Sequence, residues 1–228
     1  MADCVFDIET AALPEAQIPR SFVEKLKEQA EPDDPEGWRD RLGLYALSAQ
    51  VVVIALFNPQ SRRGEVLYDD RHGSLDAIEM PEGVEATLVG GSEAEIVDHF
   101  WKRIARYDRV VTYNGRGFDV PFMMQRALVH SIPVTVDLMP PRFHRRTNHL
   151  DLQEVLSQYR ATRPYGLGPW TEAVGASSPK EGEVSGAGVG EAFEAGRTRE
   201  IAEYCLRDVV ATTVLLEKVQ RYWSPLIG

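Results

Sequence analysis

Two acids, Asp7 and Glu9, alternate with the apolar residues Phe6 and Ile8 in a strand pattern at residues 2–9, and any fold of this chain must accommodate them. The apolar, β-favouring residues around them predict a buried strand. Because Asp7 and Glu9 are two residues apart, their side chains project from the same face of that strand. Crowding and burial disfavour the charge on such a pair unless a divalent cation coordinates it. The alternative is an edge strand whose acids face water.

A long amphipathic helix is predicted at residues 198–222, where apolar residues recur at helical spacing. Tyr204 and Asp208 are four residues apart, so their side chains stack on one face with Cβ atoms about 5–6 Å apart. A phenol and a carboxylate can therefore address the same atom. The alternative is an ordinary amphipathic boundary, in which the tyrosine packs its ring and the aspartate lies at the rim.

A third segment couples a short predicted strand, residues 108–113, to a helix that begins at about Phe118. The turn between them starts at Asn114. Asp119 falls in the first turn of the helix, where a carboxylate is favourable beside the positive helix end. Taken alone, this is a complete structural explanation for Asp119, and Pro121 supports the same helix start.

In chain order, these motifs resemble those of the DnaQ-like, DEDD-type 3′-5′ exonucleases. Asp7 and Glu9 match the first motif, Asp119 matches the second and Asp208 matches the third. Tyr204 is typical of the DEDDy subgroup. The three segments together therefore favour a metal-dependent exonuclease, although each segment has a structural explanation of its own.

The pattern Asn114-x-x-x-Phe118-Asp119 and the pattern Tyr204-x-x-x-Asp208 refine this resemblance. They are most similar to the exonuclease domain of family-B DNA polymerases and to the small free-standing predicted exonucleases related to it. The similarity spans nearly the whole chain.

The resemblance implies an α/β, ribonuclease H-like fold with a mixed five-stranded central sheet flanked by helices. Its first strand is central, which would bury the Ile8 side of the sheet and turn Asp7 and Glu9 towards a cleft. We expect a single exonuclease domain over residues 1–228, with an insertion at about 10–49. The expected strands are 2–9, 50–58, 64–69, 108–113 and 133–137, and the expected helices lie near 20–30, 93–106, 119–130, 151–159, 168–175, 187–195 and 198–222.

Composition agrees with one soluble enzyme domain. The chain has 228 residues, of which 43% are hydrophobic, and can bury one sizeable core. Its net charge of -10 argues against a broad basic surface for long nucleic acid, although an exonuclease needs to hold only a few terminal nucleotides. The apolar run Val51–Phe57 is too short to span a bilayer, and the N-terminus lacks a signal-peptide pattern. We therefore expect a cytoplasmic protein without membrane contacts. Cys4 and Cys205 are expected to be free buried thiols.

Two divalent cations, Mg²⁺ or Mn²⁺, are the cofactors that the resemblance implies. Asp7 would bridge the ions, while Glu9 and Asp208 would hold the ion that lowers the pKa of the attacking water. Asp119 would act largely through water on the ion that stabilises the leaving 3′-oxygen. Tyr204 would orient the attacking water by a hydrogen bond, because a free phenol with a pKa of about 10 is a poor base at neutral pH.

The expected substrate is the 3′ end of a single-stranded nucleic acid, cleaved to nucleoside 5′-monophosphates. DNA is favoured over RNA by the likeness to family-B polymerases, although these motifs do not reveal contacts that discriminate a 2′-hydroxyl. The alternatives are an RNA-trimming enzyme and a noncatalytic nucleic-acid-binding module. A separate polymerase or repair protein is a candidate partner. The residues expected to contact nucleic acid are Ile8 and Thr10 at the terminal sugar, Asn114 by hydrogen bonds, Phe118 by stacking and Lys180 at a phosphate.

Two loops allow both a functional and a plain structural interpretation. The stretch 141–149 could line the path of the nucleic acid strand or form an ordinary solvated loop. The Gly- and Ser-rich loop 177–190 could close over a substrate, carrying Lys180, or simply connect two helices. The basic residues of the first loop are Arg142, Arg145 and Arg146.

His149 and Asp151 resemble metal ligands, but a helix-start role is expected for Asp151.

Overall fold

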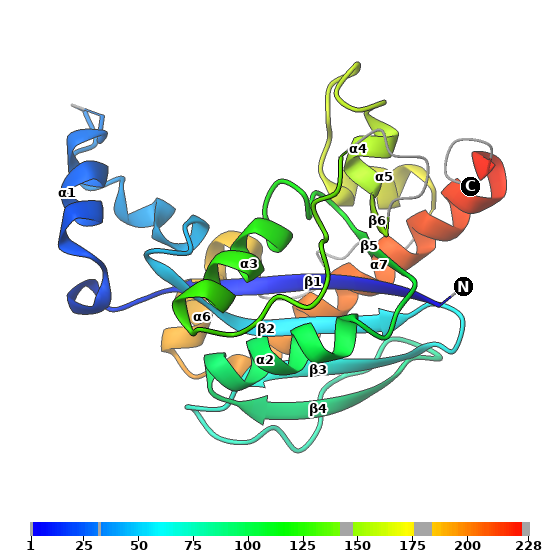
Figure 1. The fold of residues 1–228 in the computed structure, drawn as a ribbon, viewed down its shortest axis with the longest axis horizontal. Helices are drawn as coiled ribbons and strands as arrows, with labels where there is room; N and C mark the ends of the chain where they lie inside the picture. Colours follow the sequence, from blue (N-terminus) through cyan, green and yellow to red (C-terminus); the bar gives the residue numbers. More distant parts are fainter. Residues whose placement is uncertain (1, 32, 142–147, 176–183, 225–228) are drawn as a thin grey trace.

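The computed structural model describes residues 2–31, 33–141, 148–175 and 184–224, which are built around a six-stranded mixed sheet. The strand order is β4-β3-β2-β1-β5-β6, so β1 is an inner strand. It pairs antiparallel with β2 and parallel with β5 (Figure 1). The strands are β1 (Asp3–Ala12), β2 (Ala49–Asn58), β3 (Arg63–Asp69), β4 (Glu85–Gly91), β5 (Arg109–Thr112) and β6 (His149–Asp151).

Helices cover both faces of this sheet, as expected for an α/β fold (Figure 1). On one face lie α2 (Glu93–Ile104) and α3 (Asp119–Val129), and on the other lies the long α7 (Thr198–Tyr222). Among the described residues, no helix combines the length and the apolar character needed to cross a membrane. Shorter helices pack around α7, namely α4 (Leu152–Leu156), α5 (Leu167–Ala173) and α6 (Val189–Glu194).

The alternation of side chains along β1 divides the hydrophobic core into two layers. Phe6 and Ile8 point into the layer beneath α2 and α3, where Phe6 packs against Phe100 with ring centroids 5.0 Å apart. Val5 points into the layer beneath α7. The Ile8 side of β1 is therefore buried, as predicted, and the opposite side faces α7.

The sheet has one strand more than the five expected, and one of the expected strands is wrong. Residues 133–137 alternate like a strand, but they pair with no strand among the described residues, and the Thr135 hydroxyl donates to the carbonyl of Trp101. The strand beside β5 is instead β6. The additional strand is β4, an edge strand that pairs only with β3 and whose largely half-exposed residues give no clear period-two signal.

The segment expected to be an insertion, called the insertion below, spans residues 13–48 between β1, which continues to Ala12, and β2, which begins at Ala49. It contains α1 (Arg20–Glu28) between two short 3₁₀ turns, η1 (Glu15–Gln17) and η2 (Arg39–Leu44). It projects beyond the end of the sheet (Figure 1). Its own small apolar cluster consists of Ile18, Val23, Leu26, Trp38 and Leu42.

Candidate active site

The two acids of β1 lie where β1 and β5 stop pairing. The parallel ladder between these strands ends at Val5 opposite Val111, so the following residues of β1 have no strand on that side. Asp7 and Glu9 keep their antiparallel partners on β2 and project towards α7. The edge-strand alternative is therefore wrong. The register between β1 and β2 shifts immediately after Glu9, a kind of irregularity that often occurs next to functional sites.

The gap left by β5 is filled by the first turn of α3, which brings Asp119 to β1. The side chain of Asp119 is only 4% exposed, and its Oδ1 accepts a hydrogen bond of 3.2 Å from the backbone N–H of Ile8. Asp119 is the first residue of the helix, as predicted. This contact joins the first and second acidic motifs across 111 residues of chain.

The third motif approaches from the opposite side on α7, which packs on β1 and β2. Tyr204 and Asp208 are both half-buried and lie one helical turn apart, and their side chains interact. Tyr204 also lies close enough to Glu9 and Asp7 for their charges to raise its pKa. The structure thus brings together the four acids, hereafter the carboxylate cluster: Asp7, Glu9, Asp119 and Asp208.

Burial and mutual repulsion dominate the electrostatics of the carboxylate cluster. Burial raises the pKa of Asp119 to about 7, in spite of the backbone N–H groups that it accepts from, and raises that of Asp208 to about 6. Burial, followed by the neighbouring carboxylates, raises the pKa values of Asp7 and Glu9 well above their usual range. Within the described ranges, no acid of the cluster has a salt bridge to an arginine, lysine or histidine. The donor set consists of hard carboxylate oxygens without a salt bridge among the described residues, and it fits divalent cations such as Mg²⁺ or Mn²⁺.

Tyr204 is suited to hydrogen bonding rather than to proton abstraction. Burial raises its pKa, and the charges of Asp208 and Glu9 raise it further, so the phenol stays neutral at physiological pH. Gly186 lies nearby, because a Cβ atom at this position would be 3.8 Å from the Tyr204 hydroxyl oxygen.

Asp151 holds the turn that contains Asn114, in addition to the helix-start role that the sequence predicted for it. Asp151 caps α4 by accepting from the N–H groups of Gln153 and Glu154, which confirms the expected helix-start role. The same carboxylate accepts from the N–H groups of Asn114, at 3.0 Å, and Arg116, at 2.9 Å. The left-handed Asn114, with φ of 64°, is thereby fixed beside the second motif. Residues 114 and 151 are far apart in the sequence, so these hydrogen bonds could be recognised only from the fold.

His149, the other side chain that resembled a metal ligand, is engaged elsewhere. It is 2% exposed, and its ring nitrogens contact the carbonyl of Leu138 and the hydroxyl of Thr112. Burial lowers its pKa to about 4, so the imidazole is neutral. Its role is therefore structural, because these two contacts connect β6 to Thr112 of β5 and to Leu138.

The expected nucleic-acid contacts fall in different environments. Phe118 is half-buried at the N-terminus of α3, with its ring 5.5 Å from that of Phe122. The hydroxyl of Thr10 donates to the carbonyl of Gly43 in the insertion at 2.7 Å. Ile8 is 4% exposed and packs away from the carboxylate cluster, so only its backbone reaches that side. Lys180 and the arginines at 142, 145 and 146 lie outside the described residues.

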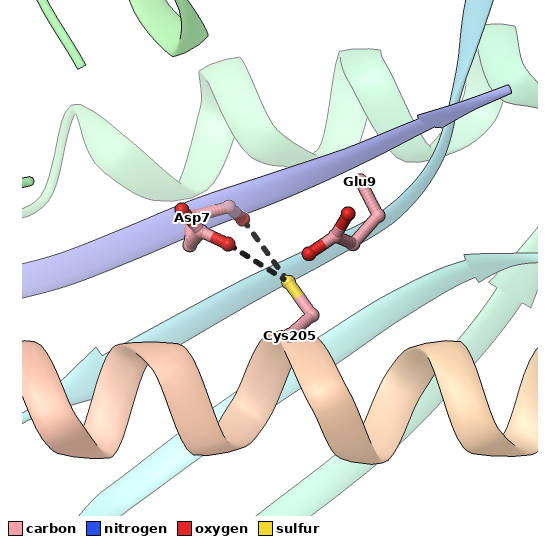
Figure 2. A group of neighbouring side chains, drawn as sticks. All are labelled: Asp7, Glu9 and Cys205. Atoms are coloured by element: carbon pink, nitrogen blue, oxygen red, sulfur yellow. Dashed lines mark hydrogen bonds between the residues drawn. The ribbon is translucent and has the colours of Figure 1, made fainter. Parts of the chain in front are cut away.

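Cys205 is the residue of this region whose place the sequence did not indicate. Both cysteines are free and buried, as expected. Cys205, however, donates from Sγ to the backbone oxygen of Asp7 at 3.5 Å and to its Oδ2 at 3.7 Å (Figure 2). Its position between Tyr204 and Asp208 on the buried face of α7 was the available signal. What that face meets depends on the packing of α7 against β1.

Comparisons with known proteins show which family this chain resembles. A family described as predicted 3′-5′ exonucleases related to the exonuclease domain of PolB matches residues 66–226. A DNA polymerase of Pyrococcus glycovorans is 31% identical over 162 residues, which are 64% of this chain and 21% of the polymerase. DNA polymerase 1 of Aeropyrum pernix is 30% identical over 93 residues, which are 39% of this chain and 10% of that protein. The chain thus spans only 21% and 10% of the length of these two relatives.

The fold has a matching counterpart among solved structures. The family B DNA polymerase of Pyrobaculum calidifontis superposes with a TM-score of 0.59 and 21% identity, covering 96% of this chain and 24% of the polymerase. The fold is therefore of the ribonuclease H-like type seen in polymerase exonuclease regions, with six strands in this chain. The family match covers most of the chain and includes the second and third acidic motifs. The chain belongs to the family of predicted 3′-5′ exonucleases related to the exonuclease domain of PolB.

Proposed function

We propose that this protein is a two-metal 3′-5′ exonuclease that removes nucleoside 5′-monophosphates from the 3′ end of single-stranded DNA. The observation that carries this proposal is the carboxylate cluster, in which three distant segments place four buried or half-buried acids together without a salt bridge to a cationic side chain among the described residues. Bound divalent ions would lower the pKa of the attacking water and stabilise the leaving oxygen. Asp7, Glu9, Asp119 and Asp208 are the residues that would hold them.

The surroundings of each acid support distinct roles. The charge of Asp7 interacts with those of all three other acids, as a residue that bridges two ions must. The strongest charge neighbour of Glu9 is Asp208, which supports their sharing one ion. Asp119 accepts a hydrogen bond from the backbone N–H of Ile8 and would act on the second ion. Tyr204, beside Asp208, would orient the attacking water through its neutral hydroxyl.

The nucleotide-binding surface is proposed to extend from Asn114 and Phe118 towards the insertion. Phe118 lines an apolar depression of about 220 Å³ between α3 and the insertion, where bases can stack. Leu44 and Leu47 of this depression are 57% and 49% exposed. Thr10 donates to the carbonyl of Gly43 in the insertion, and the Ile8 backbone N–H donates to Asp119, so contacts of these two residues with the terminal sugar remain a proposal from the sequence. Lys180 is proposed as a phosphate contact from sequence alone.

Single-stranded DNA is the favoured substrate, because both sequence relatives are named as DNA polymerases. An RNA 3′ end is the second candidate, since no described contact selects against a 2′-hydroxyl. Action alongside a separate polymerase or repair protein follows from the same relationship.

The decisive assay uses 5′-labelled single-stranded DNA and RNA with Mg²⁺, Mn²⁺ or EDTA. We expect a ladder that shortens from the 3′ end with either metal and no products in EDTA. Asp7→Ala should abolish cleavage, whereas Asp76→Ala, which removes an exposed acid outside the site, should leave it unchanged. Cleavage that resists the chelator or survives Asp7→Ala would refute the two-metal mechanism. Cleavage of RNA without cleavage of DNA would refute single-stranded DNA as the substrate and support an RNA 3′ end instead.

A further inference from the structure

Cys205 lies against the two acids of β1, and no role has yet been assigned to it. Its side chain is fully buried, at 0% exposure, on the face of α7 that packs on β1. Figure 2 shows its Sγ between the carboxylates of Asp7 and Glu9. One potential ligand atom from each of the three residues lies within 4.8 Å of the others. This spacing places an oxygen, an oxygen and a sulfur around one point.

Glu9 provides an independent indication that this point accepts a ligand. Its side chain is only 8% exposed, and in the part of the chain that the structure describes it has neither a hydrogen bond nor an ion pair. Its carboxylate is directed towards the Sγ of Cys205 (Figure 2). An ionised buried carboxylate without a donor is costly unless a cation coordinates it. The unpartnered acid therefore points to a metal at the same place that the sulfur faces.

We propose that Asp7, Glu9 and Cys205 form a site for a thiophilic divalent ion such as Zn²⁺ or Cd²⁺. Sulfur ligands favour soft and borderline ions, whereas Mg²⁺ is bound through oxygen. When the ion binds, a metal–sulfur bond replaces the S–H bond of Cys205 and the proton is released to water. The three-ligand site would occupy carboxylates that Mg²⁺ requires, so Zn²⁺ and Cd²⁺ would inhibit hydrolysis. Inhibition rests on the proposed exonuclease function, but ion binding does not.

Cys4 is a matched control within the same chain, which contains two cysteines. It is also 0% exposed and lies on β1 itself. Its side chain points into the layer beneath α2 and α3, and its Sγ contacts the carbonyl of Val5 at 3.7 Å. Any metal–thiolate bond in this protein must therefore come from one of two distinguishable positions.

The primary test is titration of the metal-free protein with Cd²⁺ while the ultraviolet charge-transfer absorption of a cadmium–thiolate bond is recorded. We expect the band in the wild type and in Cys4→Ser, and its loss in Cys205→Ser. The affinity for Cd²⁺ should fall by more than about 100-fold in Cys205→Ser, beyond the 10–100-fold that outer-shell changes typically cost. The affinity for Mg²⁺ should change little. A wild type without the band, or a Cys205→Ser variant that retains it, would overturn the proposal.

A second measurement needs no variant, so it stands even if the Cys205 substitutions fail to fold. Zinc K-edge X-ray absorption of the wild type with one equivalent of Zn²⁺ should show one sulfur among oxygen or nitrogen neighbours, and the absence of sulfur would overturn the proposal. The nuclease assay separates this site from the proposed function. Mg²⁺-dependent cleavage without a cadmium–thiolate band removes the soft-metal site alone. A Cys205-dependent band in a protein that cleaves no nucleic acid supports the site and removes the exonuclease.

Discussion

Two of the places where this protein buries acids differ in the partners that those acids have. Glu93, the first residue of α2, is 6% exposed and accepts from the guanidinium of Arg126 and from the N–H of Val51, and it also contacts His130. The acids of the carboxylate cluster are comparably buried or half-buried, yet they face mainly one another. A buried acid with a cationic partner is part of the scaffold, whereas the buried acids without a salt bridge are the proposed ligands of divalent cations.

Neutralising one acid of the carboxylate cluster should have the largest effect and tests its contrast with Glu93 most directly. Asp208→Asn should lower the exonuclease rate by on the order of 1,000-fold, because it removes a proposed metal ligand and about 4 kcal/mol of transition-state stabilisation. Without metal, its unfolding free energy should be equal to or higher than that of the wild type, since a repulsion is relieved. Single-turnover kinetics and urea denaturation measure the two quantities. An Asp208→Asn variant with near-normal activity, or one that is unfolded, would contradict the proposed difference between the carboxylate cluster and Glu93.

The same isosteric change at the paired acid should have the opposite outcome. Glu93→Gln leaves the buried Arg126, which is 4% exposed, without its counter-charge and should cost about 3–5 kcal/mol of unfolding free energy. The rate per folded molecule should be preserved, because Glu93 is not in the carboxylate cluster. Glu24→Gln is the control, since its ion pair with Arg20 is exposed and should contribute less than about 1 kcal/mol. Equal costs for the two substitutions, measured by urea denaturation, would contradict the prediction.

Tyr204→Phe tests how far the cluster depends on a neutral group beside it. Loss of the hydroxyl that positions water should lower the rate roughly 10- to 100-fold, while the affinity for metal is retained. Tyr222→Phe, at an exposed tyrosine on the same helix, should have no effect. The ratio of rates at saturating Mg²⁺ measures the contribution, and near-full activity of Tyr204→Phe would exclude a positioning role.

The smallest effect expected is a change in stability with pH. The pKa values of Asp119 and Asp208 are raised in the folded state, to about 7 and about 6, so the metal-free fold binds protons more tightly than the unfolded chain. Their contribution to stability is therefore present at about pH 4, near the unfolded pKa values, and is lost as the pH rises to about 7. Melting in EDTA should show this loss, and Mg²⁺ or Mn²⁺ at pH 8 should restore the melting temperature. A stability that rises with pH in EDTA over this interval would contradict the assignment. Asp119→Asn should flatten the profile.

The errors in the fold prediction concern elements that are defined by distant partners. Residues 133–137 have the alternation of a strand but no neighbour to pair with, while the three residues of β6 carry too little periodicity to be recognised. β4 is an edge strand with little apolar alternation. Strand identity at the margins of a sheet depends on hydrogen bonds to other strands, which a local pattern does not contain.

The sequence by itself determined which residues could form the site. The two-residue repeat of a strand puts Asp7 and Glu9 on one face, and the helical repeat does the same for Tyr204 and Asp208. The tertiary structure decided what those faces meet. It opened β1 by ending the ladder to β5, brought Asp119 to the backbone of Ile8, and placed the sulfur of Cys205 against Asp7. Backbone geometry sets the direction of a side chain locally, whereas its neighbours depend on how separate elements pack across the core.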